Sequence, residues 1–208
     1  IKYCLKMKFL ITPYVYLNKY NKICFSINKE WSDLLKKFNS QLTMITYDDE
    51  FNFNEKDLQG YDGIILSGGG EINSHKKNKV NLFRDKFEKK LLNISVKNKI
   101  PVLAVCRGYQ LVADIFKFKQ KKIKLHKNTS HNIFSEDKKK TINVNSYHTY
   151  GIVKLNKDFQ NTYKHKDNTI EICESKSKKI LCFMFHPERY SKDQIYIDNM
   201  IKKNFNIE

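Results

Sequence analysis

The chain has 208 residues, of which 40% are hydrophobic, so it is long enough for a sizeable core and suits a single domain. It carries 39 Lys and Arg against 22 Asp and Glu, which gives a formal net charge of +17. This charge does not indicate a nucleic-acid-binding protein, because the lysines are spread along the chain and the arginines are only Arg84, Arg107 and Arg189. We expect instead a positive field that favours a small anionic substrate.

Short apolar runs, none near the roughly 20 residues of a bilayer span, predict no membrane segment. The first residues, 1–8, lack the apolar stretch and cleavage site of a signal peptide, so we expect a cytoplasmic location. No CxxC pair occurs among the five cysteines, which argues against a disulfide framework or a zinc ribbon. Cys24, Cys173 and Cys182 lie in apolar surroundings and are expected to be ordinary buried thiols, whereas Cys4 is expected to lie in a mobile terminus.

The first half of the chain predicts alternating strands and helices. In chain order these are a strand at 8–12, an aromatic- and Asn-rich loop, a helix at 28–38, strands at 42–47 and 62–67, a helix at 80–98, a strand at 101–105 and a helix at 108–116. Such an order is typical of an α/β fold with a doubly wound, mostly parallel sheet flanked by helices. Ligands bind such sheets beyond the carboxyl ends of the strands.

The second half is less regular. A lysine-rich stretch at 117–140 is expected to hold one or two short strands and loops. Further short strands, some of them antiparallel, are predicted at 141–146, 151–155, 169–173 and 180–185, and a closing helix at 191–205. Because no repeat or flexible linker interrupts the pattern, we expect residues 1–208 to form a single domain.

Cys106 ends the apolar run 100–105 and is followed at once by Arg107 and Gly108 at the predicted start of a helix. The helix dipole and free N–H groups at such a site favour the thiolate, which is the nucleophilic form of cysteine. A small residue after the turn lets a substrate approach the backbone. Cys106 is therefore a candidate nucleophile, and the N–H of Arg107 is a candidate oxyanion donor.

A glycine run, 68–70, follows the strand at 62–67. It lacks the spacing of a dinucleotide-binding fingerprint and of a phosphate-binding P-loop. Because glycine tolerates positive φ, Gly69 or Gly70 is a candidate for a second N–H that faces the oxyanion.

His186 and Glu188 stand two residues apart at the end of another apolar strand, with Pro187 between them. A carboxylate hydrogen-bonded to one ring nitrogen would fix the tautomer, leaving the other nitrogen to act on Cys106. His148 is the competing candidate for the base. We predict no metal site at His126 and His131, because no carboxylate or thiolate partner is evident near them in the sequence; His75 and His165 also lack a recognisable setting.

Taken together, these motifs resemble the class I glutamine amidotransferases, a family with a flavodoxin-like sheet. The residues 101–110 (PVLAVCRGYQ) are similar to the family's nucleophile motif, and the Cys-Arg-Gly form resembles its γ-glutamyl hydrolase branch most. In chain order, 66–70 resembles the oxyanion strand, 144–148 the glutamyl-binding segment and 185–188 the His–Glu motif.

The resemblance implies a triad of Cys106, His186 and Glu188, oxyanion donors at Arg107 and at Gly69 or Gly70, and no cofactor. It also implies hydrolysis of a small-molecule γ-glutamyl amide through a glutamyl thioester. The remaining implied substrate-binding residues are Gln110, Ser146, Tyr147 and His148; Arg189, which follows the His–Glu motif, is added as a candidate contact for an anionic leaving group.

Some positions depart from the branch. Tyr109 replaces a commoner methionine, and Tyr150 stands where a glutamine often follows the His148 motif. The compact, lysine-rich form is similar to the hydrolases of bacterial capsule phosphoramidate synthesis, which implies a γ-glutamyl nucleotide amidate as substrate. Hydrolysis of a γ-glutamyl polyamine or γ-glutamyl-aminobutyrate, and ammonia supply to a separate synthetase, remain alternatives. The sequence leaves the oligomeric state open.

Overall fold

In a computed structural model, residues 6–47 and 52–207 are described, so Cys4 and the first part of the chain lie outside the described residues. The helices are α1 (Lys29–Lys37), α2 (Lys79–Lys97), α3 (Arg107–Ile115) and α4 (Gln194–Phe205), with a short 3₁₀ helix at Glu55–Leu58. The strands are β1 (Lys8–Ile11), β2 (Tyr14–Leu17), β3 (Ile23–Ser26), β4 (Gln41–Met44), β5 (Gly63–Leu66), β6 (Val102–Val105), β7 (Lys119–Lys122), β8 (Lys127–Ser135), β9 (Thr141–Tyr147), β10 (Tyr150–Lys154), β11 (Gln160–His165), β12 (Ile170–Ser175) and β13 (Ile180–Phe183).

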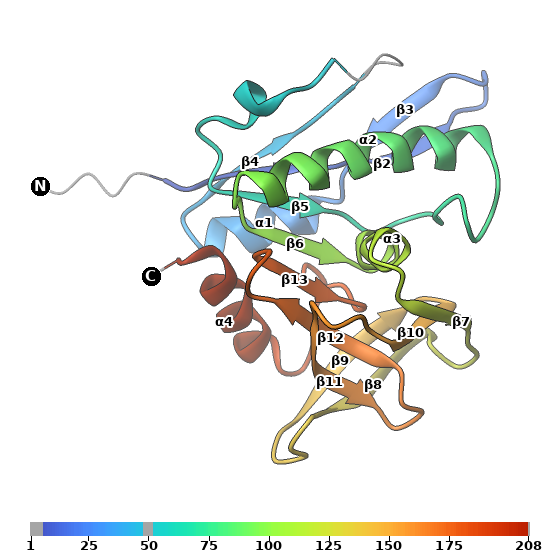
Figure 1. The fold of residues 1–208 in the computed structure, drawn as a ribbon, viewed down its shortest axis with the longest axis vertical. Helices are drawn as coiled ribbons and strands as arrows, with labels where there is room; N and C mark the ends of the chain where they lie inside the picture. Colours follow the sequence, from blue (N-terminus) through green and yellow to red (C-terminus); the bar gives the residue numbers. More distant parts are fainter. Residues whose placement is uncertain (1–5, 48–51, 208) are drawn as a thin grey trace, which may run out of the picture.

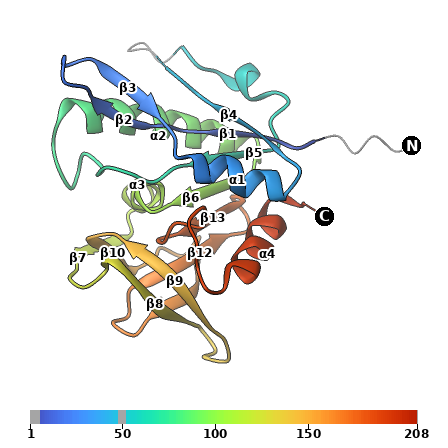
Figure 2. The ribbon, with the colours of Figure 1, turned by 180° about the vertical axis from the view of Figure 1, so that it is seen from behind.

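A parallel sheet in the order β4–β1–β5–β6–β13 forms the centre of the fold. The predicted doubly wound α/β sheet flanked by helices is confirmed. Side chains of successive strand residues point to opposite faces, as the two-residue period requires. In β6, Leu103 and Val105 face α1 and α4, whereas Val102 and Ala104 face α2 and α3. Figures 1 and 2 show these two helix pairs on opposite faces of the sheet.

An antiparallel extension continues the sheet from β13 through β12, β11 and β8 to β9, and β12 also pairs with β10, which pairs with β7. In Figure 1 this part lies below the parallel strands. The lysine-rich segment thus contributes β7 and the long strand β8. We expected only short strands in this segment, but β8 is nine residues long. Most of its residues are exposed, so the sequence shows little of the apolar pattern of a strand.

Two features were missed in the sequence. Residues expected to form a loop after β1 make the hairpin β2–β3, a separate two-stranded sheet. The strand β11 was also missed, because its polar sequence QNTYKH shows no clear alternation. No helix in the described part of the chain is long and apolar enough to cross a membrane.

Candidate active site

Cys106 occupies a strained turn between β6 and α3. Its φ is 51° and its ψ −101°, a conformation that residues with a Cβ rarely adopt. Its backbone N–H donates to the carbonyl of Phe183 at 2.7 Å, which ties the turn to β13. The thiol is therefore held at the amino end of α3, where backbone N–H groups, including that of Arg107, have no partner within the helix.

Gly108 has a different role from the one expected. A Cβ at this position would lie 2.3 Å from the carbonyl oxygen of Leu66, which is backbone and cannot move aside easily. The glycine thus lets the start of α3 pack against the end of β5. The expectation that it leaves room for a substrate is wrong, since β5 fills that space.

His186 and Glu188 lie together as the motif predicts, with 2.7 Å between Nδ1 and Oε1. Both side chains are largely buried. Asn145 holds the backbone of His186 from both sides: its Oδ1 accepts from the His186 N–H at 2.9 Å, and its Nδ2 donates to the His186 carbonyl at 2.8 Å. The sequence analysis did not single out Asn145, although it lies in the segment likened to the glutamyl-binding motif.

His186 is the main group that favours the charged form of the Cys106 thiol, and Glu188 lies at the Nδ1 side of its ring. Burial opposes the charged form of each group, but their mutual attraction outweighs it. The pKa of Cys106 is therefore lowered, and that of His186 is raised to about 10 with further help from Glu188. Both shifts favour the charged forms, a thiolate and an imidazolium.

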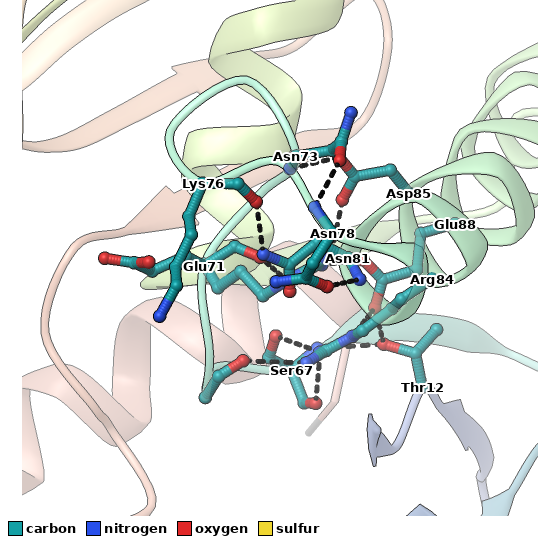
Figure 3. Close-up of polar contacts among 12 residues, drawn as sticks. Thr12, Ser67, Glu71, Asn73, Lys76, Asn78, Asn81, Arg84, Asp85 and Glu88 are labelled. Carbon is teal, nitrogen blue, oxygen red and sulfur yellow. Dashed lines mark hydrogen bonds and ion pairs between the residues drawn. The ribbon is translucent and has the colours of Figure 1, made fainter. Parts of the chain in front are cut away.

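The glycine loop after β5 is held by Arg84 of α2, whose side chain is almost fully buried (Figure 3). Its guanidinium donates to the carbonyls of Ser67 at 2.9 Å, Gly68 at 3.3 Å and Gly69 at 2.7 Å. In a trans peptide the N–H points opposite to the carbonyl. The N–H groups of Gly69 and Gly70 therefore face away from Arg84, and both glycines adopt positive φ, 86° and 75°.

Glu88 connects this loop to the nucleophile turn. Its carboxylate accepts from Thr12, the residue after β1, at 2.7 Å, from Arg84 at 2.8 Å and from Arg107. Arg107 also pairs with Asp85. From the sequence, α2 was predicted only as a helix at 80–98. The i,i+4 spacing of Arg84 and Glu88 was the available signal of an ion pair on this helix.

The expected substrate-binding residues lie in different settings. Gln110 is buried, with its amide 3.4 Å from the carbonyl of Tyr150. Ser146 is buried and donates its hydroxyl to the His126 carbonyl at 2.6 Å. Tyr147 is partly exposed and its ring lies edge-on to that of His186, with 5.7 Å between centroids.

Arg189 borders the same region. Its guanidinium lies 4.5 Å from the centroid of the Tyr147 ring, and its Nε is 3.9 Å from Oε1 of Glu188. A cavity of about 220 Å³ opens here, and its walls include Tyr14, Gly69, His186 and Arg189. A cationic group is thus available beside the imidazole at the cavity wall.

His148, the competing base, is fully buried. Its Nδ1 lies 3.0 Å from the Tyr150 carbonyl and its Nε2 lies 3.5 Å from Oε2 of Glu171. Both nitrogens therefore face protein groups, which favours a supporting role over contact with a substrate. Of the two histidines, His186 is the one bonded to Glu188.

The reason given for expecting no metal near His126 and His131 is wrong. Glu171 lies 3.6 Å from Nδ1 of His126 and 3.7 Å from Nε2 of His131, and Asp167 lies 3.0 Å from Nε2 of His126. The chain path brings these carboxylates in from β12 and from the turn before it, which residue spacing could not show. His165 ends the missed strand β11, and His75 stacks on Tyr150 elsewhere.

Comparison with known proteins agrees with this geometry. The family model described as "Glutamine amidotransferase class-I" matches residues 24–204. The chain belongs to this family.

Relatives of this chain include the "Gamma-glutamyl-CDP-amidate hydrolase" of Campylobacter jejuni subsp. jejuni serotype O:2. The two are 33% identical over 157 residues, which is 76% of this chain and 74% of the relative. The "Carbamoyl phosphate synthase small chain" of Cyanidium caldarium is 26% identical over 159 residues, 74% of this chain but 37% of the relative. The crystal structure of a glutamine amidotransferase from Thermotoga maritima has the same fold, with a TM-score of 0.67 at 18% identity, covering 95% of this chain and 85% of that one.

Proposed function

We propose that this glutamine amidotransferase-family protein hydrolyses a γ-glutamyl amide bond through a glutamyl thioester. The observations that support the proposal are the 2.7 Å contact between the carboxylate of Glu188 and the ring of His186, and the position of Cys106 at a strained strand-to-helix turn, with its thiol pKa lowered by His186. An ionised thiol, a buried imidazole and an orienting carboxylate are the components of covalent acyl transfer.

In the first half of the reaction, the Cys106 thiolate attacks the γ-carbonyl carbon. The N–H groups of Arg107 and of Gly69 or Gly70 stabilise the oxyanion that develops. The intermediate collapses to a thioester as the carbon–nitrogen bond breaks, and His186 gives its proton to the leaving nitrogen. His186 then takes a proton from water, which attacks the thioester and releases glutamate and the free thiol.

We assign the glutamyl half of the substrate to Gln110 and the backbone of Ser146 and Tyr147. For the leaving group we propose a nucleotide amidate, γ-glutamyl-CDP-amidate, which would yield cytidine diphosphoramidate for capsule modification. Two observations support this choice: the name of the Campylobacter relative, and Arg189, which places a guanidinium at the cavity wall beside His186. The positive net charge would also attract this anionic substrate.

A second candidate is a glutaminase subunit that passes ammonia to a synthetase. The match to the small chain of carbamoyl phosphate synthase favours it. A γ-glutamyl polyamine or γ-glutamyl-aminobutyrate hydrolase is a third candidate, and Arg189 argues against the polyamine because it would repel a cationic leaving group.

The test is release of glutamate by the purified protein alone from γ-glutamyl-CDP-amidate, glutamine, γ-glutamyl-putrescine and γ-glutamyl-aminobutyrate in parallel. We expect the amidate to have the highest kcat/KM and Cys106→Ala to abolish turnover. Arg189→Ala should raise KM for the amidate about tenfold or more, while Arg189→Lys restores part of it. Preference for a neutral or cationic amide, or activity only when a synthetase is added, would contradict the proposed substrate.

A further inference from the structure

Six titratable side chains gather inside the antiparallel part of the sheet, apart from the triad. Four are histidines: His126 before β8, His131 in β8, His148 directly after β9 and His165 at the end of β11. Two are carboxylates: Asp167 in the turn after β11 and Glu171 in β12. Three histidines gathered around the carboxylate of Glu171, which has no exposed surface, need a physical explanation, because burying such groups unpaired is costly.

Glu171 is at the centre of this histidine cluster. Its carboxylate oxygens lie 3.6 Å from Nδ1 of His126, 3.7 Å from Nε2 of His131 and 3.5 Å from Nε2 of His148. These separations are longer than the hydrogen-bond distance of about 2.9 Å. Two ligands bound to one tetrahedral zinc ion at roughly 2.0–2.1 Å lie about 3.4 Å apart. The spacing therefore resembles that of ligands around a shared ion.

Hydrogen bonds elsewhere on the rings fix which nitrogens face Glu171. His148 Nδ1 lies 3.0 Å from the Tyr150 carbonyl, which can only accept, so this nitrogen carries a proton. His126 Nε2 lies 3.0 Å from Asp167 Oδ2 and likewise acts as the donor. In the neutral rings, the remaining nitrogens present lone pairs toward the lone pairs of Glu171. A cation between them would turn this repulsion into coordination.

Unpartnered buried atoms mark the same place. Within the described residues, no hydrogen-bond partner is found for His126 Nδ1, His148 Nε2, Glu171 Oε2 or either ring nitrogen of His131. The side chains of His126, His148 and Glu171 are at most 2% exposed. Ligand atoms of these three lie within 4.8 Å of one another. The unpartnered nitrogen and oxygen atoms of these three side chains therefore lie close to one another.

We propose that His126, His148 and Glu171 bind one divalent transition-metal ion of the zinc class. Two imidazoles and a carboxylate are a donor set that suits zinc, and a water molecule would complete the fourth position. Asp167 and the Tyr150 carbonyl would orient His126 and His148 through hydrogen bonds to their other ring nitrogens, as partners of metal-binding histidines commonly do. His131 is left out because it does not share the mutual spacing of these three residues, and His165 because its Nδ1 lies 3.0 Å from Asp167.

Such an ion would join the loop before β8, the end of β9 and β12 at one point. It would fix His148, which directly follows Tyr147 beside the imidazole of the triad. The proposal is independent of the hydrolase activity and of the thiol, and no step of the reaction passes through the ion.

The test uses the full chain with any affinity tag removed, because tag histidines bind the same metals. We expect about one zinc per chain by elemental analysis, loss of the metal and a lower Tm after dialysis against a chelator, and recovery of both on adding Zn²⁺. Co²⁺ added to the stripped protein should give the intense visible bands of a tetrahedral site. A wild-type protein that takes up no metal and keeps its Tm with the chelator would overturn the proposal.

Variants identify the ligands. His126→Ala and Glu171→Gln should each reduce bound metal at least about tenfold. His75→Ala, a histidine outside the cluster, and Cys106→Ser, which removes the reactive thiol, should retain one equivalent. If Glu171→Gln does not fold, His148→Gln serves in its place, and the cobalt spectrum of the wild type needs no variant. Metal lost in Cys106→Ser but kept in His126→Ala would place the ion at the triad instead and refute the site.

Discussion

The ring of His186 lies directly over Gly68, so close that a Cβ on residue 68 would stand 2.5 Å from its Cε1 atom. This contact fixes the height of the imidazole above the glycine loop. The glycine here is required by space and not by an unusual φ, unlike Gly69 and Gly70 beside it.

Replacing Gly68 by alanine should therefore displace His186 and lower kcat by about 10²-fold or more, because small misplacements of catalytic groups are costly. Gly60→Ala is the matched control. Gly60 has a φ of 87° but no atom within 4 Å of an added Cβ, so this variant should lose about 1 kcal/mol of stability and keep its kcat. Equal kcat values for the two variants would contradict the proposed contact.

Asn145→Ala should lower kcat with little change in KM, since Asn145 holds the backbone of His186 and does not face the cavity. A reduction of about 10- to 100-fold is expected. Asn143→Ala, on the same strand, removes only a surface contact with Asn132 and should behave like the wild type. Steady-state kinetics on both variants decides, and a change confined to KM in Asn145→Ala would argue for substrate binding instead.

The pH dependence follows from the paired charges of Cys106 and His186. The lowered pKa of the thiol and the raised pKa of the imidazole, about 10, favour the charged form of both groups. The rate of alkylation of Cys106 by iodoacetamide should thus reach its midpoint below the ordinary thiol pKa of about 8.5. Above about pH 10, kcat should fall as His186 loses the proton that the leaving nitrogen needs.

In His186→Ala, burial would be opposed by His148 but no longer by His186, so the pKa of the thiol should rise. The alkylation rate at pH 7 should then fall about tenfold or more. Cys106→Ser gives the background from the other cysteines. An unchanged alkylation midpoint in His186→Ala would show that the helix terminus alone activates the thiol.

Glu88→Gln tests the buried charge network. The change keeps the shape of the side chain but leaves Arg84 and Arg107 without their shared carboxylate, so we expect a loss of about 3–5 kcal/mol in the free energy of unfolding. Glu55→Gln breaks the exposed pair with Lys97 and should leave the Tm unchanged within error. Denaturant unfolding measures both, and similar stabilities would mean that the network is not needed for folding.

The sequence predicted the parallel core well because each of its strands is a short apolar run followed by a recognisable turn. Cys106, the glycine loop and the His186 motif could be found since each ends such a strand, and the sheet brings strand ends together. The carboxylates near His126 could not be predicted in this way. They arrive from β12 and from the turn after β11, and the pairing of antiparallel strands is set by tertiary packing. The contact of Asn145 with the backbone of His186 could not be predicted for the same reason.

Tyr14, on the wall of the cavity, belongs to the hairpin β2–β3, whose ladder is separate from the large sheet. The residues of this hairpin can therefore be exchanged, and the hairpin lengthened or shortened, without shifting the register of β1, β5, β6 or β13. One wall of the pocket can therefore vary independently of the catalytic groups. Relatives with the same nucleophile turn can change their specificity for the leaving amine through changes in this hairpin.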